Sequence, residues 1–137
     1  MVKRVQTILC ACLILILCLS GCGIEQADSN KVKDIDFTVV EDSEVPEDLK
    51  LIIEEKQTDN FKITFTTDKY LYIAIGYGEQ STNGYSIAVE ELYLTSNAVY
   101  IKTNLIGPAK GDVVSDVKSY PYVVVKIESI DKNVVFE

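Results

Sequence analysis

The sequence predicts an α+β fold: a compact domain of mostly antiparallel strands, in a small sheet or a sandwich-like arrangement, with one short docked helix. Three observations predict it. Apolar and polar residues alternate in several short segments, turn-forming residues separate these segments, and one earlier stretch has helical spacing. The chain has 137 residues, and the part with this pattern, residues 34–137, is long enough to form a single domain around one core.

The N-terminal segment predicts export. Two basic residues precede an uncharged apolar run of 12 residues, 8–19, whereas a membrane-spanning helix needs roughly 20. The run ends in Leu19-Ser20-Gly21-Cys22, which resembles the bacterial lipobox. The resemblance implies a lipoprotein signal peptide over residues 1–21, diacylglyceryl transfer to the sulfur of Cys22, and a mature chain anchored on the extracytoplasmic side of the cell membrane. The alternatives are an ordinary secretory signal or an uncleaved anchor, and both also predict export.

The composition excludes several classes of function. The chain has no His, which removes the usual general base, the Ser-His and Cys-His nucleophile pairs and the commonest metal ligand. All four Cys lie within the first 22 residues, so no disulfide crosslinks the domain that follows. The formal net charge is −8, and this sign disfavours binding to nucleic acid.

The negative charge is concentrated near the N-terminal end. Residues 25–59 hold 12 acidic and 4 basic residues, whereas residues 60–137 hold 9 acidic and 7 basic residues. This acidic stretch is either a solvated face that repels lipid headgroups or an acidic docking surface.

The first elements of the domain follow a flexible tether. Residues 22–33 are small and polar without an apolar period, which is typical of a linker. Alternation over residues 34–39 predicts a strand. Pro46 predicts the start of a helix that ends near Lys56, with acidic residues in its first turn. The apolar stripe expected to dock on the sheet consists of Leu49, Ile52 and Ile53.

The rest of the chain has the pattern of strands. Strands are expected over residues 61–65, 70–75, 85–89, 99–105, 120–127 and 134–136. The first four form two hairpins, because Asp68-Lys69 and Ser96-Asn97 supply turns between them. Residues 70–75 are apolar on both faces, which is typical of a central strand.

Two aperiodic loops, residues 76–87 and 107–119, are the candidate binding site, because loops on a rigid sheet commonly carry function. All eight Tyr lie between Tyr70 and Tyr122. Tyr combines contact area with a polar tip and suits a protein-binding surface, although Tyr is also an ordinary residue of strands. The candidate binding residues are Thr82, Asn83, Gly84, Tyr85, Tyr120, Pro121 and Tyr122.

The same loops resemble a known family. Gly84-Tyr85-Ser86-Ile87 after Thr82, the pair Gly111-Asp112 and the run 120–127, Tyr-Pro-Tyr-Val-Val-Val-Lys-Ile, are similar to the C-terminal domain of the PrcB family over about residues 76–136. The family usually has Gly at the position of Asn83, and Asn tolerates positive φ, so the turn is expected to survive. The namesake of the family is a lipoprotein subunit of a surface protease complex. The resemblance therefore implies a membrane-anchored domain that binds another protein, a surface or secreted protease.

The sequence predicts a non-enzymatic protein without cofactor, metal ion or catalytic residue. Glu90 and Glu91 are neighbours on a predicted strand, so they should point to opposite faces and fail as an acid–base pair. Asp112 and Asp116 are too few ligands for a Ca²⁺ site. Two alternatives to a protease-assembling role remain: a protease inhibitor that acts through Ser81–Tyr85, and a domain that binds cell-wall glycan through exposed Tyr.

Overall fold

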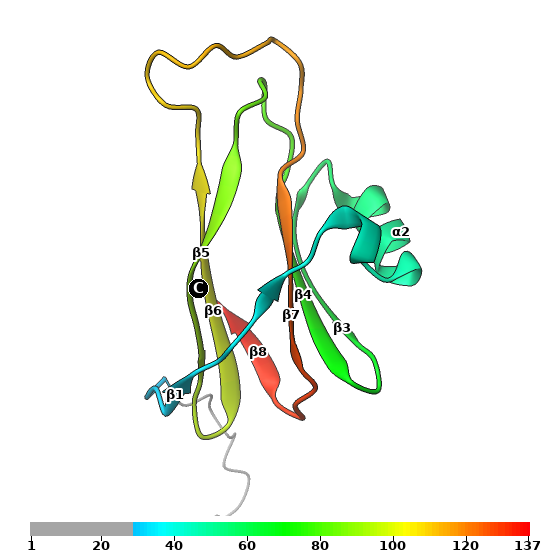
Figure 1. The fold of residues 1–137 in the computed structure, drawn as a ribbon, viewed down its shortest axis with the longest axis vertical. Helices are drawn as coiled ribbons and strands as arrows, with labels where there is room; N and C mark the ends of the chain where they lie inside the picture. The colour runs from blue at the N-terminus through cyan, green and yellow to red at the C-terminus, as the bar shows by residue number, and fades with distance from the viewer. Residues whose placement is uncertain (1–28) are drawn as a thin grey trace, which may run out of the picture.

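The computed structural model describes residues 29–137, so the predicted signal peptide, Cys22 and most of the predicted tether lie outside the described residues. Two four-stranded sheets lie face to face, and one helix covers the outer side of one of them (Figure 1). The predicted class, α+β with mostly antiparallel strands in a sandwich-like domain, is confirmed.

The first sheet is built around the first predicted hairpin. β3 (Asn60–Thr66) pairs over its whole length with residues 71–77 of β4 (Tyr70–Tyr77). β7 (Tyr122–Glu128) pairs with the other side of β4, and β2 (Thr38–Val39) completes the order β2-β7-β4-β3. β4 is buried over all but its two end residues, as its two-sided apolar sequence predicts.

The second sheet is built around the second predicted hairpin, β5 (Ser86–Leu94) and β6 (Ala98–Ile106). β1 (Lys33–Asp34) and β8 (Asn133–Phe136) flank it in the order β1-β5-β6-β8. β8 runs parallel to β6. The short apolar run of β8 predicts a strand but not its partner or its direction. The sequence therefore did not predict this parallel pairing.

The main core lies between the two sheets. Alternate residues of β4 and β7 meet alternate residues of β5 and β6, and the buried members are Leu71, Ile73, Ile75, Leu92, Val99, Ile101, Val123, Val125 and Ile127. Strand residues face alternately to each side of a sheet, so this spacing puts every second residue of these strands in the core.

The helix packs on the outer face of the first sheet. The short 3₁₀ turn η2 (Asp42–Glu44) leads into α2 (Glu47–Lys56), whose Leu49 and Ile53 are buried in a cluster with Phe61, Ala74 and Val124. A helix of 10 residues is marginal alone in water, so this packing stabilises it. Burying each aliphatic side chain contributes roughly 1.5–3 kcal/mol.

The strand predicted over residues 34–39 is wrong as a single element. Its start belongs to β1 in one sheet and its end to β2 in the other, so the segment crosses from sheet to sheet (Figure 1). Ile35 packs against the core, but Phe37 and Val39 are 40% and 55% exposed. Alternation alone cannot show that a chain changes sheets between two residues.

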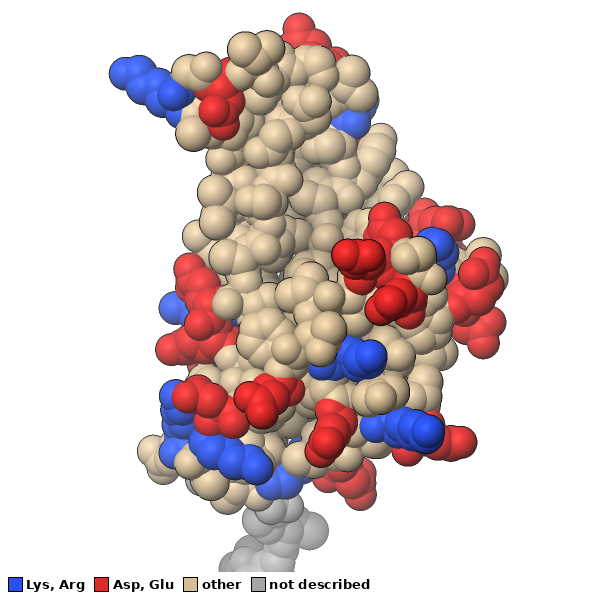
Figure 2. Space-filling model, viewed as in Figure 1, with Lys and Arg blue, Asp and Glu red and all other residues tan. Residues whose placement is uncertain are grey.

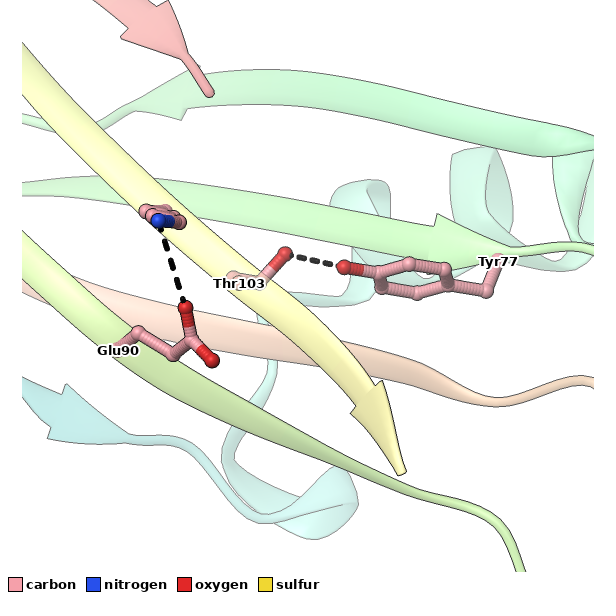
Figure 3. A network of polar contacts seen from close by, with 4 residues as sticks. Tyr77, Glu90 and Thr103 are labelled. Carbon is pink, nitrogen blue, oxygen red and sulfur yellow. Dashed lines mark hydrogen bonds and ion pairs between the residues drawn. The ribbon is translucent and has the colours of Figure 1, made fainter. Parts of the chain in front are cut away.

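A β-bulge in β5 changes the geometry predicted for its two glutamates. Val89 and Leu92 both pack toward the core although three positions separate them, and the pairing with β6 shifts by one residue between Val89 and Glu91. Glu90 and Glu91 therefore both lie on the exposed side, and the prediction that they point to opposite faces is wrong. Glu90 Oε2 lies 3.8 Å from Lys102 Nζ (Figure 3).

Beyond the bulge, the hairpin continues as a two-stranded ribbon of Ser86–Val89 and Thr103–Ile106, termed the β5–β6 ribbon. β8 pairs with β6 only over Ala98–Ile101, and β1 pairs only with the far end of β5. Neither flanking strand of the described chain therefore reaches the ribbon, which leads directly into the loops at that end of the sandwich.

Candidate functional site

Two loops lie together at one end of the sandwich (Figure 1). Residues 78–85 join β4 to β5, and residues 107–121 join β6 to β7; we term them the loop pair. Since β4 and β7 are neighbours in one sheet, and β5 and β6 in the other, the topology brings the two loops side by side.

Hydrogen bonds join the two loops. Gln80 and Ser119 form an antiparallel bridge in which each backbone N–H donates to the carbonyl of the other, at 2.8 and 3.0 Å. Ser119 Oγ also donates to the Thr82 carbonyl (2.6 Å). The Ser115 N–H donates to Asn83 Oδ1 (3.0 Å). Asn83 therefore does more than tolerate a turn, because its side chain holds the second loop.

Gly84 is required by the backbone and by packing. Its φ of +88° lies in the left-handed region that favours glycine. A Cβ at this position would lie 3.1 Å from both Pro108 Cγ and Val114 Cγ1. The absence of a side chain at Gly84 therefore allows the second loop to pack closely against the first.

Gly76 has a different role, although it lies in the same aperiodic stretch of the sequence. It belongs to β4, opposite Phe61 of β3. A Cβ on Gly76 would overlap the Phe61 ring. Its missing side chain makes room for an aromatic ring across the hairpin and does not form a turn.

The second loop and the end of β6 expose apolar side chains that the sequence patterns did not single out. Val113 is fully exposed, and Val117, Ile106 and Val114 are 62%, 47% and 37% exposed. We term these four residues the apolar tip. Single exposed aliphatic residues are ordinary, and these four lie within 12 positions of the sequence, separated by Lys110, Asp112 and Asp116. The signal was a cluster of Val in a stretch with Gly, Pro and no strand period, where no core face could use them.

Figure 2 shows charged residues on both sides of the loop pair. Acidic and basic residues gather over the lower half of the molecule and around α2, and the stretch just below the loop pair is free of them. Within the loop pair, Lys118 Nζ lies 2.6 Å from Glu79 Oε1, so the two charges compensate each other. This hydrogen-bonded contact with Glu79 raises the pKa of Lys118.

A hydrogen bond between the sheets supports the base of the loop pair. The hydroxyls of Tyr77, at the end of β4, and Thr103, on β6, lie 2.6 Å apart (Figure 3). The Tyr77 N–H donates to the Pro121 carbonyl (3.1 Å). Tyr77 therefore connects β4 both to the β5–β6 ribbon and to the end of the second loop.

The structure brings together most of the predicted binding residues. Thr82, Asn83 and Gly84 contact the second loop as described, and a Cβ on Gly107 would lie 3.5 Å from the Tyr85 ring. Tyr120 and Pro121 are partly buried where that loop joins β7.

Tyr122 lies apart from the loop pair. Its ring packs with the helix-side cluster, and its hydroxyl donates to Asp42 Oδ1 (2.6 Å). Burial, followed by this hydrogen bond, raises the pKa of Tyr122 to about 12. Its position at a loop–strand boundary suggested a binding role, but sequence position cannot show which face of the sheet a residue occupies.

The loop pair is better suited to contact with another molecule than to catalysis. The backbone N–H of Ala109 donates to Asp112 Oδ2 (2.9 Å), so this carboxylate caps its own turn. Within residues 29–137, no three His, Cys, Asp or Glu side chains are grouped so as to hold a metal ion. None of the described helices is long and apolar enough to cross a membrane.

Comparison with known proteins gives a match to one family model. Residues 71–128 match the family described as PrcB C-terminal. The matched segment runs from β4 to β7 and so contains the loop pair and the β5–β6 ribbon. No curated protein and no solved structure matches the chain.

Proposed function

We propose that this chain is a non-enzymatic lipoprotein, anchored through a lipid on Cys22 at the extracytoplasmic side of the cell membrane, whose domain binds another protein through the loop pair. The partner is a surface or secreted protease, which the domain assembles or stabilises. The lipobox-like sequence supports the anchor. The match to the PrcB C-terminal family supports the protein partner.

The observation that carries the binding proposal is the apolar tip on its supported base. Val113 is fully exposed, and burying a valine side chain contributes roughly 1.5–3 kcal/mol. The Gln80–Ser119 bridge and the Asn83–Ser115 hydrogen bond already fix the loops. Binding therefore requires little further ordering of the chain, which lowers its entropic cost.

The place of the loop pair in the domain suits an anchored protein. β1 pairs with the Tyr93–Leu94 end of β5, whereas the loop pair begins at the opposite end of the hairpin, at Ser86 and Ile106. A strand of this length spans roughly 25–30 Å. In a chain held at the membrane by its N-terminal side, the loop pair therefore lies at the end of the domain far from the point of attachment.

The inhibitor alternative requires Ser81–Tyr85 to enter a protease cleft on its own. Thr82 and Asn83 are hydrogen-bonded to the second loop, and Gly84 lies against Pro108 and Val114. These contacts favour joint use of both loops in an assembly contact over insertion of one loop.

Photo-crosslinking tests the proposal. A benzophenone amino acid replaces Val113 in the full chain in its native membrane, and in the control it replaces Leu51, an apolar residue of α2 that is 57% exposed. We expect a protein adduct from position 113 and none from position 51, because only the first lies on the loop pair. Mass spectrometry of the adduct identifies the partner.

The outcomes separate the candidate functions. An adduct with a protease subunit, whose amount at the cell surface falls when the chain is deleted, supports assembly. An adduct with a protease that loses activity on stoichiometric addition of the purified chain favours inhibition. No adduct from position 113 contradicts protein binding through the loop pair, and pelleting with purified cell wall then tests glycan binding.

A further inference from the structure

We propose that an extended segment of a partner protein pairs as an added strand with the free edge of β6 over Thr103–Ile106, beside the end of β8. This inference rests on the proposed function, protein binding at this end of the domain. It adds the mode of binding and the kind of partner: a flexible segment with apolar residues at alternate positions.

The backbone of β6 presents hydrogen-bonding groups at this edge. The Glu137 N–H donates to the Ile101 carbonyl (2.9 Å), so the polar groups of Ile101 point toward β8. Backbone groups alternate in direction along a strand, so those of Thr103 and Leu105 point the same way. They lie beyond the last β6–β8 pair, Ile101 with Phe136, and no strand of residues 29–137 pairs with them on that side.

Two other open edges of the sandwich carry features that oppose strand addition. On β3, Lys62 lies on the face toward the other sheet, with its Nζ 5.8 Å from the Phe136 ring. On β5, the bulge at Glu90 distorts the edge and adds charge. Inward charges and bulges are devices that protect sheet edges from pairing. Thr103–Ile106 of β6 has neither a charged residue nor a bulge.

The side chains of the ribbon define what an added strand must offer. Thr103 faces the other sheet, where it meets Tyr77, and Leu105 shares that face two residues later. An added strand would place alternate residues on the same inner side, next to the partly buried Leu105. Apolar residues suit those positions. Glu137, whose N–H donates to the Ile101 carbonyl, marks the start of this edge, and Thr103–Ile106 beyond it carry no charge.

The edge is held in strand geometry before any partner arrives. β6 pairs with β5 up to Ile106, and the Tyr77–Thr103 hydrogen bond fixes the ribbon to the other sheet. Pre-organisation of this kind reduces the ordering cost of binding. Ile106 also belongs to the apolar tip, so one partner can contact the edge and the tip together.

A synthetic strand tests the proposal on the full chain in detergent micelles. The probe is a fluorescent ten-residue peptide in which Val alternates with Thr and Lys, and its control is the same peptide N-methylated throughout its centre, which cannot pair with an edge. We expect the probe to slow amide hydrogen exchange at Thr103 and Leu105 at least tenfold. The amide of Asn104, which points to β5, serves as the internal control and should not change. The N-methylated peptide should bind at least tenfold more weakly.

Two substitutions at one position supply a matched pair. Leu105→Lys introduces an inward charge like that of Lys62 on β3, whereas Leu105→Thr removes the apolar side chain without adding charge. We expect the first to weaken probe binding at least tenfold and the second to weaken it less than threefold. The exchange measurement on the unaltered chain needs no substitution, so the test stands if the lysine variant does not fold.

Three results would overturn the proposal: no binding of the probe, protection at β3 or Glu90 in place of Thr103 and Leu105, or concentration-dependent protection of these two amides without the probe. The last would mean that a second copy of the chain occupies the edge. The crosslinking experiment from Val113 tests the proposed function independently, because it does not use the peptide probe. A Val113 adduct without edge protection would keep the loop pair as a binding surface and remove the added strand.

Discussion

The hydrogen bond from Tyr122 to Asp42 ties the start of β7 to the turn before α2. Because burial and this bond favour the neutral phenol, the pKa of Tyr122 in the folded chain is about 12, above the ordinary value of 10.0. The folded state therefore holds this proton more tightly than the unfolded state. The resulting contribution to stability is complete below pH 10 and is lost as the pH rises through about 12.

We expect Tyr122→Phe to remove this pH dependence while it keeps the ring in place. The difference in unfolding free energy between the natural chain and the variant should be constant below pH 10 and should shrink as the pH approaches 12. Urea unfolding across the alkaline range measures this difference. Phenolate absorbance should show that the variant lacks a group that titrates near 12; loss of a group that titrates near 10 would contradict the assignment.

Two glycines of the loop pair allow backbone strain to be separated from packing. Gly84 and Gly111 have φ values of +88° and +93°, but a Cβ on Gly111 meets nothing within 4 Å, whereas one on Gly84 meets Pro108 and Val114. We expect Gly111→Ala to cost about 1–2 kcal/mol from backbone strain alone. Gly84→Ala should cost about 1 kcal/mol more, because its Cβ also crowds the second loop. Equal costs in urea unfolding would show that the second loop shifts to accept the Gly84→Ala methyl group without a further cost.

Among the elements, α2 depends on its buried face. Leu49 is 0% exposed and Leu51, in the same helix, is 57% exposed. We expect Leu49→Ala to lower the free energy of unfolding by about 2–5 kcal/mol, since it leaves a cavity against the sheet. Leu51→Ala should change it by less than about 0.5 kcal/mol. Circular dichroism and urea unfolding of the two variants test this, and a similar cost for both would mean that the buried face of α2 does not set its stability.

Strong local patterns predicted most of the elements. Alternation in Phe61, Ile63 and Phe65 marked β3 and one of its faces, and the two-sided apolar run starting at Tyr70 marked the central strand. The predictions that were wrong concern features that no local sequence pattern indicates. The segment that contains β1 and β2 has the alternating pattern of a single strand. The β-bulge at Glu90 has no sequence pattern of its own and is visible only in the pairing of β5 with β6.

The candidate site was only partly predictable for a related reason. The Thr82–Tyr85 turn was visible because Gly and Asn mark unusual backbone. The contacts of this turn with Ser115 and Ser119 join residues far apart in the chain, and their partners have no special residue type. The Val residues of the apolar tip were missed because an aperiodic loop gives no face to which they could be assigned.

At the scale of the whole molecule, β1, the first described strand, lies at one end of the domain, and the loop pair lies at the other end. We expect Cys22→Ala to move the protein from the membrane fraction to the soluble fraction and to remove the mass of the lipid. Two or more acyl chains give stable anchoring where one gives only marginal binding. Fractionation and intact-mass spectrometry test this, with Cys18→Ala as the control that should stay at the membrane. A Cys22→Ala variant that stays membrane-bound with unchanged mass would contradict the lipobox interpretation.

The crossing of residues 35–37 between the sheets has a mechanical consequence. A pull between the N-terminal side and a partner on the loop pair runs along the strands and reaches the domain first at β1, which is held by two residue pairs with β5. Beyond β1 the chain enters β2, which pairs with β7 of the other sheet. Tension on the N-terminal side therefore loads the β1–β5 and β2–β7 pairings in shear, where the hydrogen bonds of a strand resist together, and it is shared between the two sheets.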